Sequence, residues 1–388
     1  MTQSPLPPVC IVAPHFTETT QTFVHRHVRE LNGGNTVLVG RQQDDGGTHG
    51  KPLLYWPKPV LRPEKLGLWR QWFGPPQERD LGSFPDDFAA FLHRHGVGVV
   101  LCEFGTTGIH FSALCKRAGV PMFCYFRGHD STKALRDGQY RAALRRMFDE
   151  ADGIVGVSAY LLGRLAKRGF VHPNAHVIPS GVDTPVFMPT EKDPDLVLAV
   201  GRMVEKKAPL TTIRAFAKVA RSHPTIRLEM IGGGWMMKHA HKLVARLGLE
   251  GRVMLHGEQG HEFVADRMRR AAIFVQHSVT SLGGDAEGAP TAIQEAMTAG
   301  AAVVSTRHAG IPELIEEGVT GLLVRERDLG GYTRALQAVV ADRALRARLG
   351  AAAHAHAIEH FDYRKLYVRL EAAMAAAIAG RASTPQLH

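Results

Sequence analysis

The sequence has little of what marks disulfide-linked or metal-clustered proteins. Its 388 residues include four cysteines and no CxxC pair, and no spacing among its 21 histidines predicts a metal site. Three of the cysteines lie in apolar runs, where a thiol behaves as a small hydrophobic group. We therefore expect reduced, buried cysteines with neither a disulfide nor a metal role, at Cys10, Cys102, Cys115 and Cys124.

The first residues lack a recognisable targeting signal. Residues 1–8 carry no basic segment, and the apolar run at residues 9–12 is too short for a signal peptide or a membrane span. The sequence therefore predicts a cytoplasmic protein. Aromatic and basic residues mix in the stretch 62–73, which leaves two interpretations open: peripheral binding at the inner face of the cell membrane, or a surface helix packed on its own domain.

The net charge of +10 has no basic tail or arm behind it. Residues 1–190 carry 21 Lys and Arg against 16 Asp and Glu, and the remainder carries 26 against 21. Positive charge suits nucleic acid, an anionic membrane surface or phosphate-bearing ligands. Its even spread disfavours a nucleic-acid partner.

Length and pattern predict an α/β protein of two domains. A chain of 388 residues, with 45% hydrophobic and 22% charged residues, is long enough for two globular cores. Short β-branched runs alternate with amphipathic stretches, as in doubly wound parallel sheets. The strands are expected at residues 9–13, 36–39, 97–102, 122–126, 153–157 and 177–178, then at 196–200, 226–231, 253–255, 273–275, 302–305 and 321–324.

A proline-rich stretch divides these two sets of strands. It covers residues 184–195 and predicts a domain boundary near residue 190, with domains at 1–190 and 191–360. Apolar residues recur with helical spacing over 363–379, which predicts a final docked helix. The motif Asp193-Pro-Asp195 lies in the stretch, so we interpret it as a turn rather than as a metal site.

A helix with two carboxylates is the strongest local signal. Pro290 suits the first turn of this helix and Gly300 its end, so Glu287 precedes the helix and Glu295 lies inside it. The free N–H groups near Thr291 suit a diphosphate. For the two carboxylates we expect contacts with hexose hydroxyls and ribose hydroxyls. The alternative is a capped helix with two surface carboxylates.

A second motif places cations directly after a buried strand. Gly201 ends the strand, and Arg202 and Lys207 flank the loop that follows it. Ligands of open α/β sheets bind at the carboxyl ends of strands. Both side chains can therefore meet a departing diphosphate and stabilise its developing charge. The alternative is a solvated basic turn.

Together these motifs resemble a known family. G-R-x-x-x-x-K at 201–207 and E-G-x-P-x-x-x-x-E-A-x-x-x-G at 287–300 resemble the retaining glycosyltransferases of GT-B fold known as family 4, or glycosyl transferases group 1. The segment 178–187 is similar to the family's I-P-N-G-V-D-x-x-x-F, with Ser180 in place of Asn. The turn 231–234 is similar to its glycine-rich turn.

The resemblance implies two Rossmann-like domains facing each other across a cleft, with the last helix, about 361–380, crossing back to the first domain. The donor, a sugar on a nucleotide such as UDP or GDP, would sit on the second domain, and no cofactor or metal would be required. The residues expected to bind the donor are Arg202, Lys207, Pro290 and Thr291 for the diphosphate, and Glu295, Glu287, Gly288, Gly232 and Gly234 for the ribose and the sugar. The two last glycines would leave room for the nucleotide.

The first domain would take the acceptor. Residues 14–23 resemble the S-E-T-F variant found among relatives that build exopolysaccharide or lipid-linked oligosaccharide, so Thr20 and Gln21 are expected either near the acceptor or as helix caps. Residues 126–130 resemble the H-G-x-D segment of the reaction centre. There Arg127 occupies the usual histidine position and is expected to bind either a donor phosphate or an anionic acceptor. His129, two residues on, is a candidate for the histidine's polar role, and Asp130 either faces the acceptor or caps a helix.

The resulting hypothesis is transfer of a hexose, with retention, to a hydroxyl of a glycan, a lipid-linked acceptor or a small molecule. The catalytic candidates are Arg127, His129 and Glu287, and no protein nucleophile is named. Closure of the cleft would exclude water and favour transfer over hydrolysis. The alternatives are a GT-B-shaped nucleotide sugar epimerase, a non-catalytic sugar-nucleotide or glycan binder, and a nucleic-acid binder.

Overall fold

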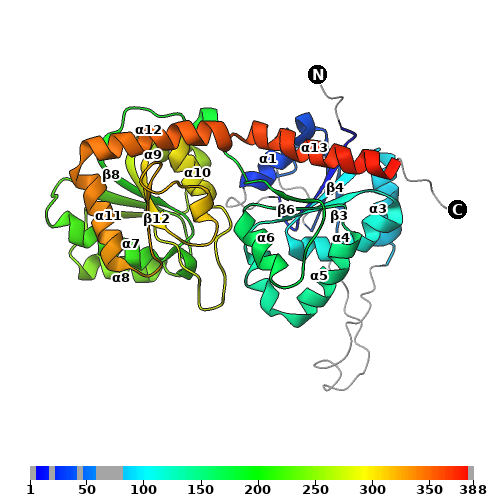
Figure 1. Cartoon of the computed structure of the whole chain (residues 1–388), viewed down its shortest axis with the longest axis horizontal. Coiled ribbons are helices and arrows are strands. Elements are labelled where there is room, and N and C mark those ends of the chain that lie inside the picture. The colour runs from blue at the N-terminus through cyan, green and yellow to red at the C-terminus, as the bar shows by residue number, and fades with distance from the viewer. Residues whose placement is uncertain (1–5, 17–21, 42–46, 58–81, 383–388) are drawn as a thin grey trace, which may run out of the picture.

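The protein is built from two parallel sheets that lie next to each other, each covered by helices (Figure 1). The computed structural model describes residues 6–16, 22–41, 47–57 and 82–382. The chain leaves the first sheet at Val177 and enters the second at Asp193. The predicted fold class, with two doubly wound α/β units, is confirmed.

The first sheet has its strands in the order β3-β2-β1-β4-β5-β6-β7. Alternate strand residues belong to two separate apolar clusters, with Ile11 and Leu101 in one and Cys10 and Val100 in the other. Both faces are therefore covered, as parallel sheets require. The strands are β1 Val9–Val12, β2 Thr36–Gly40, β3 Leu53–Tyr55, β4 Val99–Glu103, β5 Met122–Phe126, β6 Gly153–Gly156 and β7 Ala175–Val177, and the helices include α1 Thr22–Glu30, α3 Phe84–Arg94, α4 Gly105–Ala118, α5 Gly138–Glu150 and α6 Ala159–Ala166.

The second sheet has the order β10-β9-β8-β11-β12-β13. The strand order reverses beside β8 and β11, and such a reversal is where α/β sheets bind ligands, at the carboxyl ends of the strands. The strands are β8 Asp193–Val200, β9 Arg227–Ile231, β10 Val253–Gly257, β11 Ala271–Gln276, β12 Ala302–Thr306 and β13 Leu322–Val324, and the helices are α7 Pro209–Ala220, α8 Met237–Arg246, α9 His261–Arg270, α10 Thr291–Thr298, α11 Leu329–Ala341 and α12 Arg343–His360.

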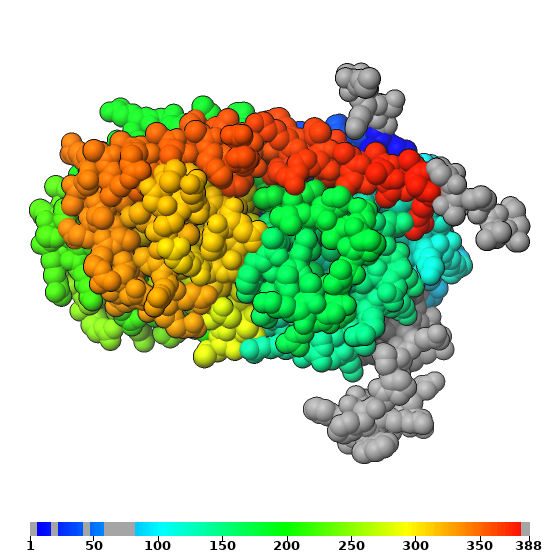
Figure 2. Space-filling view, in the orientation of Figure 1, coloured from blue at the N-terminus to red at the C-terminus, as the bar shows by residue number. Residues whose placement is uncertain are grey.

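The last helix, α13 Tyr363–Ala382, crosses back to the first sheet as predicted, and it runs on from α12 along one side of both halves (Figures 1 and 2). At the crossing, the backbone N–H of Val182 donates to Phe361 and that of Tyr363 donates to Val182. Farther along, Arg381 makes two hydrogen bonds of 2.6 and 2.7 Å to the carboxylate of Asp152. The two chain crossings between the halves therefore lie side by side.

Two details differ from the sequence predictions. Strand β3, which has three residues, was not predicted. The interpretation of Asp193-Pro-Asp195 as a turn is wrong, since these residues begin β8, where a proline is tolerated at the start of a strand. Asp193 pairs with Arg227, and Asp195 accepts a hydrogen bond from Thr225.

All four cysteines are free and buried, as expected. Within the described ranges, no helix has the length and apolar character needed to cross a membrane. The aromatic and basic stretch 62–73 lies outside the described residues. The exact domain limits, 1–190 with the last helix and 191–360, stay predictions.

Candidate functional site

Arg202 and Lys207 line one pocket at the carboxyl ends of β8 and β11. Lys207 lies in a single 3-10 turn, Glu205–Lys207, that follows the strand. Its Nζ lies 3.1 Å from Oε1 of Gln276, the last residue of β11. Arg202 is exposed, and no ion pair to it is found among the described residues. The pocket is lined by Ala199, Val200, Gly201, Arg202, Met203, Lys207, Pro209, Thr212, Met230, Val275 and Gln276.

Glu287 lies beside this pocket and pairs with two lysines. Its Oε1 lies 3.3 Å from Nζ of Lys207 and 4.0 Å from Nζ of Lys206, and Lys206 also lies 3.2 Å from Oδ2 of Asp285. Burial alone would raise the pKa of Glu287, but the two ammonium groups outweigh it and lower the pKa to about 2. Glu287 is therefore ionised at neutral pH and acts only as an acceptor of hydrogen bonds.

Sequence reasoning missed Lys206, Gln276 and Asp285 as members of this cluster. Lys206 stands next to Lys207, and Gln276 directly follows the predicted strand 273–275 and ends the observed β11. The signal that pointed to Arg202, a polar side chain at the carboxyl end of a strand, also applies to Gln276.

Helix α10 begins at Thr291, with Pro290 at the position before it rather than inside the first turn. Glu295 lies on this helix and is 8% exposed. Burial raises its pKa to about 7, despite the more distant charges of Arg26 and Lys207. Its protonation therefore changes close to neutral pH.

The glycines of the turn after β9 serve packing between loops. A Cβ on Gly232 would lie 2.2 Å from the carbonyl oxygen of Gly201, and one on Gly234 would lie 2.5 Å from that of Met203. At both positions a side chain would meet the protein's own backbone, and the room for a nucleotide stays a prediction. These glycines let the loop that carries Arg202 lie directly against the turn.

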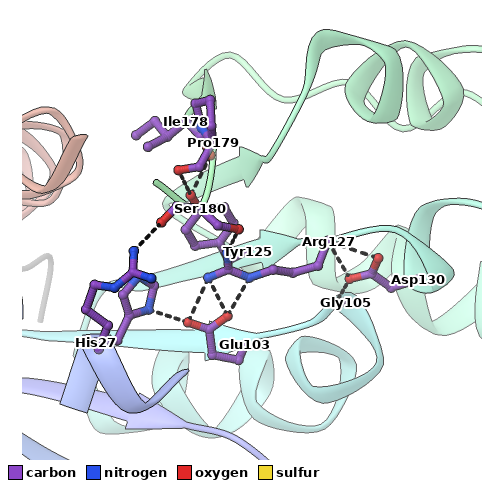
Figure 3. A network of polar contacts seen from close by, with 10 residues as sticks. His27, Glu103, Gly105, Tyr125, Arg127, Asp130, Ile178, Pro179 and Ser180 are labelled. Carbon is purple, nitrogen blue, oxygen red and sulfur yellow. Dashed lines mark hydrogen bonds and ion pairs between the residues drawn. The ribbon is translucent and has the colours of Figure 1, made fainter. Parts of the chain in front are cut away.

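The side chain of Arg127 points toward Glu103 in the first half of the molecule (Figure 3). Its guanidinium donates to both carboxylate oxygens of Glu103, at 2.9 and 3.1 Å, and to Oγ of Ser180 at 2.8 Å. It also lies over the rings of Phe23 and Tyr125, at 3.9 and 3.7 Å from the ring centres. The side chain is 7% exposed.

These contacts give no support to the predicted role of Arg127 on a donor phosphate. Glu103 ends β4, and His27 on α1 contacts its other side at 2.5 Å. Burial opposes ionisation of Glu103, but Arg127 and His27 outweigh it and lower its pKa. Because Ser180 belongs to the segment between the halves, Arg127 ties the loop after β5 to that segment.

The other two predicted residues of this loop differ in burial. Asp130 is buried, and its carboxylate accepts hydrogen bonds from the backbone N–H groups of Gly105, Arg127 and Gly128. It therefore caps α4 and closes its own loop, rather than capping a helix that starts at Ser131. His129 is exposed. Thr20 and Gln21 lie outside the described residues.

The loop after β5 touches the loop of Glu287. A Cβ on Gly288 would lie 2.5 Å from the carbonyl oxygen of Arg127, so only glycine permits this approach. Nearby, the carboxylate of Glu313 accepts 2.7 Å hydrogen bonds from the backbone N–H groups of Ala159 and Tyr160, at the start of α6. The two halves are thus in direct contact beside the predicted donor site.

The part of the chain that the structure describes contains no group of three or more His, Cys, Asp or Glu side chains arranged to hold a metal ion. The charge at the site comes instead from Arg202, Lys206 and Lys207, with Asp285 and Glu287 opposing them. Such a set can hold a phosphate-bearing ligand by cations alone.

Comparison with known proteins gives matches along most of the chain. A family model described as Glycosyl transferases group 1 matches residues 186–356, and one described as Glycosyltransferase Family 4 matches residues 41–185. The first of these covers the cluster of Arg202, Lys207 and Glu287.

Curated relatives match over part of their length. The chain is 30% identical over 247 residues to WcaL of Escherichia coli (strain K12), provisionally named as a colanic acid biosynthesis glycosyltransferase, with 62% of this chain and 61% of that protein covered. It is 29% identical over 246 residues to a GDP-mannose-dependent alpha-(1-6)-phosphatidylinositol monomannoside mannosyltransferase of Mycolicibacterium smegmatis, with 59% and 64% covered. The matches span 61% and 64% of the length of these two relatives.

Solved structures match over most of the chain. The structure of Alr3699/HepE from Anabaena in complex with UDP has a TM-score of 0.77 at 16% identity, with 96% of this chain and 100% of that chain covered. At this identity the likeness concerns the fold alone, and it confirms the predicted GT-B arrangement.

Proposed function

The chain belongs to the glycosyltransferases of group 1 and family 4, and from this premise we propose that it moves a hexose from a nucleotide diphosphate sugar to an acceptor hydroxyl. The acceptor would be a glycan or a lipid-linked sugar in polysaccharide or glycolipid biosynthesis. The names of the relatives, which refer to colanic acid biosynthesis and to a phosphatidylinositol mannoside, support this class of acceptor.

The convergence of Arg202 and Lys207 on one pocket carries the proposal. The pocket opens at the carboxyl ends of β8 and β11, where the strand order reverses, so it stands where an α/β sheet binds a nucleotide. The guanidinium and the ammonium group would hold the two phosphates, and the unpaired N–H groups at the start of α10 would add to them. No metal or other cofactor is required in this proposal.

Glu287 and Glu295 would hold the rest of the donor. The low pKa of Glu287 keeps it an acceptor for hexose hydroxyls. Glu295 lies about one turn into α10 and would accept hydrogen bonds from the ribose. Gly288 brings the acceptor half against this segment, which would place the reacting hydroxyl close to the sugar.

In the reaction, the bond between the anomeric carbon and the diphosphate oxygen breaks, and its electron pair leaves with the nucleoside diphosphate. Arg202 and Lys207 would stabilise the charge that develops there. The acceptor oxygen attacks from the same face and passes its proton to the departing phosphate oxygen, so the configuration is retained without a protein nucleophile. His129 is the exposed side chain of the loop after β5 and stays the candidate on the acceptor side, whereas Arg127 would shape the loop.

A thermal-shift experiment on the full chain tests the site. UDP, GDP and their sugars are added in turn, and a bound donor at 100 times its Kd adds about 2.7 kcal/mol to the stability of the folded state. We expect Arg202→Ala and Lys207→Ala to abolish the shift and to lower turnover about 100-fold or more. Lys218→Ala, an exposed lysine on α7, is the matched control and should behave as the unmodified chain.

Equal donor binding and turnover in both variants and the control would place the diphosphate elsewhere. Mass spectrometry of the products separates the other activities. An epimerised nucleotide sugar formed without an acceptor identifies an epimerase, and donor binding without turnover on any glycan or lipid-linked acceptor identifies a binding protein. Peripheral membrane contact stays a proposal, for which the exposed Arg145 and Arg146 of α5 are candidates.

A further inference from the structure

Residues 280–287, a part of the connection between β11 and α10 that we call the loop 280–287, are fixed at both ends by a pair of side chains outside the predicted site. Its first end is the backbone N–H of Thr280, which donates to Oε2 of Glu326 at 2.9 Å. Its second end is the backbone N–H of Glu287, which donates to Nε2 of His308 at 3.1 Å. His308 in turn contacts Oε1 of Glu326 at 2.6 Å.

The proton positions of His308 follow from its partners. The N–H of Glu287 is a donor, so Nε2 of His308 must offer its lone pair. The neutral ring then carries its proton on Nδ1 and donates it to Glu326. The His308 side chain is fully buried, which holds this arrangement away from competing water.

The backbone is strained beside both residues. His308 follows β12 and precedes Ala309, which has φ of 49°, and Glu326 follows β13 and precedes Arg327, which has φ of 62°. A residue with a side chain adopts such angles at a cost, so the surrounding contacts must hold it there. His277 provides one of these contacts, because its Nε2 accepts a hydrogen bond from the N–H of Arg327 at 3.1 Å.

We infer that His308 and Glu326 are positioning residues for the donor sugar, because they fix the backbone of Glu287 and both ends of the loop 280–287. The inference rests on the proposed function, in which Glu287 holds the hexose. Neither residue touches the diphosphate pocket, whose lining includes neither of them. The pair therefore sets the place of the sugar and leaves the hold on the phosphates to Arg202 and Lys207.

Two substitutions of His308 separate its contact with Glu287 from its contact with Glu326. His308→Gln keeps an acceptor close to the place of Nε2, and His308→Asn keeps a donor close to the place of Nδ1. We expect His308→Asn to lose the contact to Glu287 and to lower kcat with the nucleotide sugar about tenfold, the effect of a buried donor left unpaired. His308→Gln should recover most of this loss. UDP or GDP without the sugar should bind both variants within about twofold of the unmodified chain.

Hydrogen exchange of the full chain without ligand tests the fixing of the loop independently of the enzymatic activity. Exchange at residues 280–287 should be faster in His308→Asn than in His308→Gln, and faster in Glu326→Gln than in the unmodified chain. His354→Asn is the matched control, since His354 bonds to the carbonyl of Thr298 at the far end of α10. It should change neither exchange in the loop nor kcat.

Unchanged exchange in the loop, or equal kcat in His308→Asn and the unmodified chain, would overturn the inference. So would a parallel loss of sugar-free nucleotide binding in His308→Asn, because that points to general damage. Failure of the proposed function is distinct, since the unmodified chain would then bind no nucleotide sugar while the exchange result still decides whether His308 and Glu326 hold the loop.

Discussion

Each half of the molecule brings a cation, a carboxylate and a histidine together. The two clusters differ in how many of their polar atoms have a hydrogen-bond partner within the protein. In the first half, Glu103 bonds to both Arg127 and His27, and Arg127 also donates to Ser180. In the second half, Lys207 and Glu287 lie 3.3 Å apart, yet Oε1 of Glu287 accepts no hydrogen bond of good geometry in the described structure.

The same holds for Oδ1 of Asp285, which is also buried without a partner in the described chain. Native proteins pair nearly all their buried polar atoms, so atoms left over deserve an explanation. Under the proposed function, hydroxyl groups of the donor would supply hydrogen bonds to those of the second cluster. The first cluster has its bonds within the protein and therefore contributes structure, which is the main lesson of the comparison.

Removal of Glu103 should break the first cluster with the largest effect. Glu103→Ala leaves Arg127 buried without its counter-charge, and we expect the free energy of unfolding to fall by about 3–5 kcal/mol. Urea unfolding measures this change. Asp86→Ala is the matched control, because it removes an ion pair with Arg117 that is exposed on both sides and should change stability little.

Glu103→Gln keeps the shape and one acceptor, so its stability should lie between those of Glu103→Ala and the unmodified chain. A loss below about 1 kcal/mol in Glu103→Ala would contradict the comparison, because it would mean that Arg127 finds water or another partner. In that case the guanidinium could turn toward the acceptor, as the sequence first suggested.

The fold was predictable from the sequence because its strands and helices depend on patterns of residues that are close together in the chain. Short apolar runs between amphipathic stretches predicted the strands of both sheets except β3, which has three residues and follows a proline. The pairing of Lys207 with Glu287 was within reach, since each lies in a motif anchored on a strand end or a helix start. These elements depend on residues near to one another in the chain.

The direction of Arg127 was not predictable in this way. Its partners, Glu103 and Ser180, lie 24 and 53 positions away, and only the tertiary fold brings them to it. The same reason hides the contact between Glu313 and α6, which are 154 positions apart. Nor did the sequence distinguish a glycine that makes room for a ligand from one that makes room for a loop, as Gly232 does.

A pH series tests the predicted donor site in the second half of the molecule. Glu295 has a pKa of about 7, raised by burial, and a ribose hydroxyl donates a stronger hydrogen bond to its ionised form than to its protonated form. We expect the affinity for UDP or GDP to fall about tenfold from pH 8 to pH 6, as the ionised fraction falls. Calorimetry measures this affinity. Glu295→Gln should bind more weakly at pH 8 and should lose this part of the pH dependence.

The same group should act on stability with a fixed sign. Because the folded pKa of Glu295 lies above its unfolded value, the folded state holds the proton more tightly, and stability is lost as pH rises through about 7. Glu295→Gln should therefore gain stability relative to the unmodified chain at pH 8 and not at pH 4. Equal pH profiles for the two proteins would show that Glu295 titrates normally and is open to water.

Glu313 offers the smallest effect and tests the contact between the halves that carry the two clusters. Its carboxylate faces two N–H groups at the start of α6, where the helix dipole favours negative charge. Glu313→Gln keeps the size and removes the charge, so we expect kcat/KM to fall about two- to fivefold, while urea unfolding of the isolated protein changes little. Glu316→Gln, three residues on and also exposed, is the matched control.

Small-angle X-ray scattering should give a larger average radius for Glu313→Gln than for the control, because the two halves separate more often. An equal radius together with an equal kcat/KM would mean that the contact is only a cap on α6, and that the backbone approach at Gly288 is enough to hold the halves together.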